Sequence, residues 1–212
     1  MYRNPIDLVR LFLSLFQDMS TLPRTIYVPG AALLVCYPVL AVALGPEAKS
    51  QAFVTAFMLA LGIRIAIGFE GMVRRMLTKF SKGQTVILAF CLPALPMLVL
   101  AAADDPLWCQ RMQSAFYIAA GAIFLVDVLM GRVDTAATFW SDAGMRDYLP
   151  NLSRMMVVYN FTFLLLNETM IHGLDASQWV LFWAVLPVIG HTVLRALVLT
   201  VINLDDDGTH PV

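Results

Sequence analysis

Six long apolar stretches constrain the fold of this chain more than any other feature. They cover residues 26–44, 51–73, 84–103, 113–130, 155–171 and 179–202. A helix needs roughly 20 mostly apolar residues to cross a bilayer, and unsatisfied backbone groups in lipid are costly, so such stretches must be helices rather than open strands. The alternating pattern of a membrane β-barrel is absent. We therefore predict an all-α fold, a polytopic membrane helix bundle of about six transmembrane helices that forms a single integral membrane domain over residues 1–212.

The amino-acid composition is that of a chain surrounded by lipid rather than by water. Of the 212 residues, 59% are hydrophobic and only 14% are charged, whereas soluble domains carry about 25% charged residues. The net charge of -1 gives no case for nucleic acid as a partner. Cys36, Cys91 and Cys109 form no CxxC pair and no cluster with histidine, so neither a metal site nor a disulfide framework is indicated.

Basic residues alternate between the loops and predict an orientation. The Lys and Arg counts in the N-terminal segment and the five following loops run 3, 1, 4, 1, 3 and 0. Because cytoplasmic loops are enriched in Lys and Arg, the N-terminus is predicted to lie inside, and six spans return the C-terminus to the inside. Trp108 and Trp179 fall where the outer aromatic belt of such a bundle is expected. The bundle covers residues 26–202 and leaves an acidic tail at 203–212.

Two segments have the pattern of helices that lie in the membrane interface. Residues 1–20 are predicted to hold an N-terminal interfacial amphipathic helix, with Asn4 as its cap and Pro5 at its first position. This helix is either a packing strut or an element that docks a partner. The loop between Arg132 and Arg154 is predicted to hold a second, shorter helix. Its apolar side consists of Val133, Ala136, Ala137 and Trp140.

Three charged side chains fall inside the predicted spans. Arg64, Asp127 and Arg195 all lie within about 10 Å of the midplane, towards the cytoplasm. Arg64 continues a row of small residues at i, i+4 spacing, which predicts that it faces the bundle interior. An ionisable group in a membrane is a functional candidate, and Asp127 is predicted to pair with Arg64 or Arg195. The alternatives to a direct functional role are a purely structural ion pair or arginines that extend to the headgroups.

Further polar candidates lie in the last two spans. His191 falls near the midplane, where it either relays protons or packs through a hydrogen bond. Asn160 and Asn167 share one helix face and are expected to form interhelical hydrogen bonds. Glu168 and His172 are one turn apart, but no third ligand has a clear place, so no metal is assigned. The sequence shows no HExxH, GxSxG, Walker or GxGxxG motif, so the chain is predicted not to be an enzyme and to need no cofactor.

The segment from about residue 101 to residue 199 carries an ordered set of short motifs. They are an acidic outer loop at Asp104-Asp105-Pro106-Leu107, a Gly131-Arg132 pair after a span, an aromatic span that ends in Asn167-Glu168, and Trp179-Val180 before the last span. In this order of features the chain resembles the intracellular septation protein A family, small polytopic proteins of the bacterial inner membrane. The resemblance implies multi-pass localisation in the inner (cytoplasmic) membrane and a role in envelope integrity or division. It carries over no catalytic residues.

Three functions are compatible with these features. The first is a non-enzymatic scaffold or accessory protein of the septation protein A type, embedded in the lipid bilayer and acting through other membrane proteins. The second is a small proton-coupled transporter that uses Arg64, Asp127, His191 and Arg195. The third is an accessory subunit of a respiratory or photosynthetic membrane complex. Stable co-purifying partners would indicate the first or third function, and transport in liposomes would indicate the second.

Overall fold

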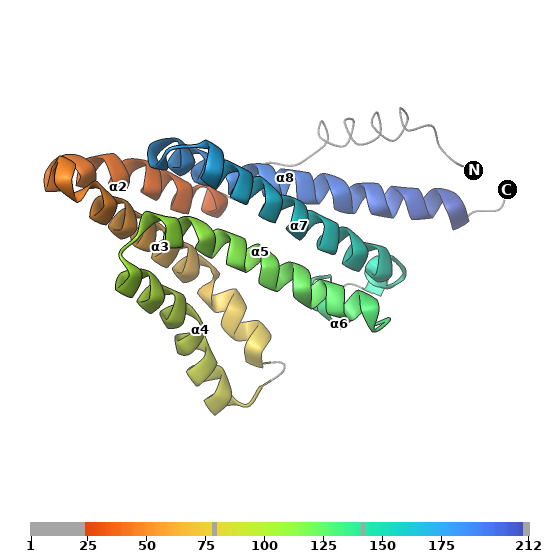
Figure 1. Ribbon diagram of the computed structural model, residues 1–212. Coiled ribbons are helices and arrows are strands. Elements are labelled where there is room, and N and C mark those ends of the chain that lie inside the picture. Colours follow the sequence, from red (N-terminus) through yellow and green to blue (C-terminus); the bar gives the residue numbers. More distant parts are fainter. Residues whose placement is uncertain (1–23, 78–79, 141–142, 210–212) are drawn as a thin grey trace. The chain divides into compact units, whose positions relative to one another are not determined.

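The computed structural model describes residues 24–77, 80–140 and 143–209 (Figure 1). The predicted interfacial helix at residues 1–20 lies outside them. Most of the described residues are helical, and no strand occurs in these ranges. In chain order the elements are η1 (Arg24–Ile26), α2 (Val28–Leu44), η2 (Pro46–Ala48), α3 (Lys49–Leu77), α4 (Lys82–Ala103), α5 (Pro106–Leu129), α6 (Asp134–Phe139), η3 (Ala143–Tyr148), α7 (Leu149–Gly173) and α8 (Ala176–Thr209).

Each of the six predicted stretches coincides with one long helix, which confirms the all-α class. Among the described residues, four helical segments are long and apolar enough to cross a membrane, namely Pro46–Leu77, Lys82–Ala103, Pro106–Leu129 and Ala176–Ile202. The apolar helix α2 is shorter, with 17 residues, and α7, with 25 residues, is not among the four. The number of six spans therefore stays a prediction. α8 continues as a helix to Thr209, into the segment predicted as an acidic tail.

Side chains at the helix ends explain why several helices begin where they do. Ser81 and Gln84 form a capping box at the start of α4, in which the Ser81 hydroxyl accepts from the Gln84 N–H at 3.4 Å and the Ser81 N–H donates to Gln84 Oε1 at 3.2 Å. Asp175 and Gln178 exchange the equivalent bonds before α8, at 2.8 and 3.2 Å. Such reciprocal bonds satisfy amide groups that the helix itself cannot.

The chain divides into two compact units. Residues 23–113 and 168–187 form one, which we call the aromatic unit, and residues 114–167 and 188–212 belong to the other, which we call the polar unit and discuss for its described residues only. Helices α5, α7 and α8 each contribute residues to both units. The names refer to the side chains that fill the two interiors.

Rings and alanines fill the interior of the aromatic unit. Phe53, Phe57, Trp179 and Trp183 are all buried, and the Phe57 ring lies 6.0 Å from Trp179 and 5.3 Å from Trp183 between centroids. Both indole N–H groups are buried without a hydrogen-bond partner. The expectation that Trp179 belongs to an aromatic belt is therefore wrong, because its ring packs in the core, whereas Trp108 is exposed as a belt residue would be.

Helix α2 approaches α8 closely at one glycine of the aromatic unit. A Cβ atom on Gly30 would lie 2.6 Å from the carbonyl oxygen of Ala184 and 2.9 Å from its Cα. Because both atoms belong to the backbone, no rotamer change can make room. Small residues at this crossing permit the close contact that stabilises helices in lipid.

Helix α4 is the least covered part of the aromatic unit. It packs against α3, and its buried side chains are only Thr85, Ala89 and Leu100. Large apolar side chains such as Ile87, Phe90 and Leu98 are exposed around most of its circumference. An exposed apolar surface of this extent marks contact with lipid or with another protein.

The short helix α6 confirms the helix predicted for the loop after α5, and its place in the membrane interface stays a prediction. Gly131 adopts a left-handed conformation with φ of 64° after α5 ends, and α6 follows directly. The four residues of the predicted apolar side all pack in one cluster with Phe124 and Leu149. They are Val133, Ala136, Ala137 and Trp140.

Candidate functional site

Five buried polar side chains lie in the interior of the polar unit, and we call them the polar seam. They are Ser114 and Asp127 on α5 and Ser153, Asn160 and Asn167 on α7. Polar groups are costly to bury in an apolar medium unless they form hydrogen bonds. Their bonding therefore determines what this interior can do.

Asn167 connects two helices of the seam. Its side chain is fully buried, and Nδ2 donates to the hydroxyl oxygen of Ser114 at 2.8 Å. The bond joins α7 to α5 across 53 positions of the sequence. The prediction of an interhelical hydrogen bond is thus confirmed for Asn167. Such bonds contribute about 0.6 kcal/mol on average in membrane helices.

Asn160 behaves differently from Asn167, although the two share a helix face. Its Nδ2 donates to the carbonyl oxygen of Met156 at 2.7 Å, one turn back in the same helix. The expectation of an interhelical bond is therefore wrong for Asn160. The residue of α5 that lies next to Asn160 is Gly121, where an added Cβ would lie 3.3 Å from the Asn160 Cβ. The glycine brings the helices together by contact rather than by hydrogen bonding.

Aromatic side chains of α5 and α7 pack next to the polar seam, near Gly190 of α8. The rings of Tyr159 and Phe163 lie 4.5 Å apart between centroids, and Tyr117 lies 5.8 Å from Phe163. A Cβ on Gly190 would lie 2.8 Å from the Tyr159 hydroxyl oxygen. Gly190 therefore allows α8 to approach a polar atom of α7, which a larger residue would push away.

Asp127 holds the loop helix against the end of α5. Its Oδ2 accepts from the backbone N–H of Thr135 at 2.7 Å, in the first turn of α6. Its backbone carbonyl accepts from the Arg132 N–H at 2.8 Å. Amides in the first turn of a helix lack partners within the helix, and a carboxylate is favourable there. Asp127 therefore fixes the position of the apolar side of α6.

The predicted ion pair of Asp127 stays a prediction. Arg195 belongs to the same polar unit as Asp127 and is half-buried. Arg64 belongs to the aromatic unit, and its side chain is exposed. The expectation that Arg64 faces the bundle interior is therefore wrong.

The row of residues that led to this expectation is buried in the first half of α3 and exposed in the second. Ala52, Ala56 and Ala60 are fully buried, but Arg64 and Gly68, which continue the same spacing, are exposed. The buried face of α3 is confined to its first half, from Ala52 to Leu61. Regular spacing on a helix predicts a common face, but it does not predict how far the packing partner extends.

The remaining candidates are divided between the two units. His191 is half-buried in the polar unit, whereas Glu168, also half-buried, belongs to the aromatic unit. His172, one turn beyond Glu168, is exposed. Among the described residues, no three His, Cys, Asp or Glu side chains are grouped so that they could hold a metal ion.

Several important contacts of the seam were not singled out from the sequence. Ser114, Tyr159 and Gly190 carry contacts between helices, yet each residue is ordinary in a membrane helix. The available signal was spacing, because Ser114 and Gly121 are seven positions apart and so share one face of α5. Hydrogen bonds and close contacts between helices are therefore the chemistry that the seam supports.

Comparison with protein-family models, with curated proteins and with solved structures found no match to this chain. The function therefore has to be argued from the residues and their arrangement.

Proposed function

We propose that this chain is a non-enzymatic scaffold of the bacterial inner membrane, similar to septation protein A, that acts through other membrane proteins in envelope integrity or division. In this proposal it crosses the membrane six times with both ends in the cytoplasm. The charge alternation of the loops and the order of motifs between residues 101 and 199 support it. The polar seam supports it as well, because its contacts join helices.

The exposure of α4 is the observation that carries the proposal. Ile87, Cys91, Ala94 and Leu98 are all exposed, and their spacing of four, three and four positions places them on one face. The buried Thr85, Ala89 and Leu100 lie on a different face. A span that packs against one neighbour and presents a face with one small residue is suited to contact a helix of another membrane protein.

Cys91 allows a partner on this face to be tested by crosslinking from a residue that the chain already has. A chain with Cys36→Ala and Cys109→Ala keeps Cys91 as its single thiol, to which a photoreactive group can be attached in native membranes. We expect irradiation to join Cys91 to the same membrane protein that co-purifies with the chain in native lipid. Its identity distinguishes a division or envelope protein from a subunit of a respiratory complex.

The matched control places the thiol on a different apolar surface. Val42 of α2 is 84% exposed, so Val42→Cys with Cys91→Ala samples a second exposed apolar surface. We expect only lipid adducts there. Lipid adducts alone at both positions, or the same protein at both, would contradict a partner surface on α4.

A buried carboxylate favours one second candidate, a small proton-coupled transporter. Asp127 is an ionisable group in the interior of the polar unit, and such groups mark proton and ion pathways in membranes. In this candidate Arg64, Asp127, His191 and Arg195 carry the function. Purified protein in liposomes would then move a substrate with protons, and Asp127→Asn would abolish this movement.

A further inference from the structure

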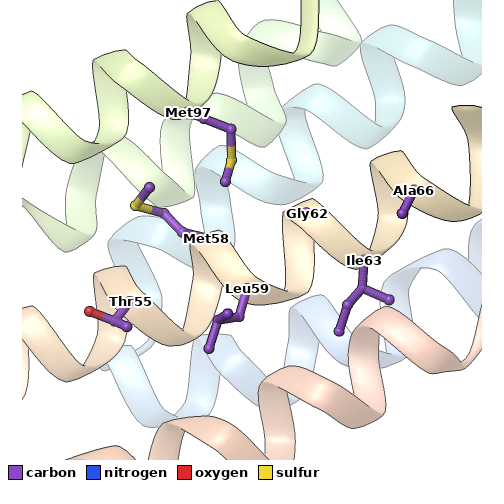
Figure 2. Close-up of a pocket in the computed structure, with 7 residues that line it drawn as sticks. All are labelled: Thr55, Met58, Leu59, Gly62, Ile63, Ala66 and Met97. Carbon is purple, nitrogen blue, oxygen red and sulfur yellow. The ribbon is translucent and has the colours of Figure 1, made fainter. Parts of the chain in front are cut away.

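An apolar groove lies between α3 and α4 in the aromatic unit (Figure 2). Its volume is about 640 Å³. Thr55, Leu59, Gly62 and Ala66 line it from α3, and Met97 extends into it from α4. The hydroxyl of Thr55 is the only polar side-chain group in the lining.

Gly62 leaves the middle of this groove open. A Cβ atom on Gly62 would have no atom within 4 Å, although the residue is half-buried. The two methionines, Met58 and Met97, border the same space. Methionine side chains are flexible and polarisable, so they adapt to an apolar ligand of variable shape.

The length of the groove matches one leaflet of a bilayer. Residues 55–66 rise by roughly 16 Å along the helix axis, about half the thickness of the ~30 Å hydrocarbon core. Both helices are long and apolar enough to cross a membrane. Thr55 lies towards the first residue of α3, Lys49, and residue 62 is the midpoint of the apolar stretch 51–73, so the groove begins in the leaflet that contains the N-terminal half of this helix and reaches just past the midplane.

We propose that this groove binds one acyl chain of a zwitterionic phospholipid, with the headgroup near the N-terminus of α3. A helix, about 10–12 Å across, is the competing occupant of this face, and lipid adducts in the groove would exclude it. An acyl chain is thinner and follows an apolar channel. The proposal depends on α3 and α4 spanning the membrane and not on the scaffold function.

The charged residues at the start of α3 and after the end of α4 are of both signs, as a zwitterionic headgroup requires. Lys49 begins α3 and is exposed, and Asp104 and Asp105 follow the end of α4 and are also exposed. The N-terminus of α3 adds a partial positive charge of its helix dipole. A headgroup with both a phosphate and an ammonium group matches these charges better than a purely anionic one.

Photo-crosslinking tests the site directly. The full chain is placed in nanodiscs of phosphatidylethanolamine and phosphatidylglycerol, with a trace of phosphatidylethanolamine that carries a photoreactive group in its acyl chain. We expect adducts concentrated on the peptides with Thr55–Ala66 and Met97. Gly62→Leu fills the groove and should lower these adducts about tenfold, because contacts of several methylene groups are lost.

Gly68→Leu is the matched control. Gly68 lies on the same helix, is exposed and also has no atom within 4 Å of an added Cβ, but it does not line the groove. It should leave the adducts unchanged. Ala66→Leu, a second groove variant, should reduce them as Gly62→Leu does.

Three results would overturn the proposal. Adducts spread evenly over the exposed residues of α4 would show that the groove has no preference over the general lipid surface. Equal adduct yields in Gly62→Leu and Gly68→Leu would show that the groove is not the site. Labelling by a photoreactive phosphatidylglycerol in preference to phosphatidylethanolamine would contradict the zwitterionic headgroup.

Discussion

Helices meet through rings, alanines and a glycine in the aromatic unit, whereas they meet through amides, hydroxyls and glycines in the polar unit. Phe53, Phe57, Trp179 and Trp183 fill the first interior, and the second holds the polar seam beside Tyr159 and Phe163 together with an apolar cluster around Phe124 and Leu149. Both interiors belong to a chain with the composition of a membrane protein. The two units therefore show two solutions to one problem.

The problem is the weak hydrophobic drive between helices in an apolar solvent. Lipid tails are as apolar as leucine, so association depends on close packing and hydrogen bonds. The aromatic unit depends on shape and should be sensitive to added atoms. The polar unit depends on hydrogen bonds and should be sensitive to removed donors and acceptors.

Gly30→Leu should have the largest effect on stability and tests the dependence of the aromatic unit on shape. The new side chain collides with the backbone of Ala184, so we expect a loss of about 3 kcal/mol, at the upper end of the usual cost of overpacking. Gly62→Leu, which meets no atom within 4 Å, should change stability little. Thermal unfolding in detergent measures both. Equal melting temperatures for the two variants would contradict the close contact of α2 with α8.

Asp127→Asn should have the next largest effect and tests the carboxylate of the polar unit. The variant weakens the charge-assisted bond to the Thr135 N–H, which should lower stability by about 1.5–3 kcal/mol. Proteolysis of the segment between Arg132 and Arg154 should become faster, because α6 loses its attachment. Unchanged stability together with lost transport would instead favour the transporter candidate.

The predicted ion pair of Asp127 is tested by combining substitutions. If Arg195 is the partner, Asp127→Asn with Arg195→Gln should be more stable than the sum of the single effects predicts, because no buried charge is left uncompensated. The same combination with Arg64→Gln tests the other predicted partner. A double-mutant cycle with no coupling to either arginine would reject the pair.

Asn167→Ala should have the smallest effect, about 0.6 kcal/mol, which is the average for hydrogen bonds between membrane helices. Asn167→Ala and Ser114→Ala should be non-additive, because they remove the same bond. Asn160→Ala serves as the control, since its bond stays within α7 and it should show no coupling to Ser114→Ala. Coupling of Ser114 to Asn160 rather than to Asn167 would contradict the arrangement of the seam.

The sequence predicted the helices better than it predicted the contacts of their polar residues. The helices follow from runs of apolar residues, and α6 followed from the spacing of Val133, Ala136, Ala137 and Trp140. Both are local properties of the chain. The bond between Asn167 and Ser114 was predicted only as an interhelical bond, because the sequence does not say which helix faces which.

The wrong expectations share a physical cause. Trp179 has the position of a belt residue but packs against Phe53 and Phe57, and Arg64 continues a buried row but lies beyond its end. The hydrogen bond from the Thr135 amide to Asp127 was not predicted. It forms because the turn at Gly131 brings the chain back to the Asp127 carboxylate. Each case depends on where a neighbouring segment starts or stops, and periodicity along one helix does not contain this information.

The six-span topology is the central claim, and three single cysteines test it most directly. In a chain without Cys36, Cys91 and Cys109, one thiol is placed at Lys82, Arg146 or Asp175, all of which are exposed and hence open to a reagent on their own side. We predict that a membrane-impermeant thiol reagent labels Asp175→Cys in intact cells and labels Lys82→Cys and Arg146→Cys only after permeabilisation. Labelling of Lys82→Cys or Arg146→Cys from outside intact cells would contradict the topology.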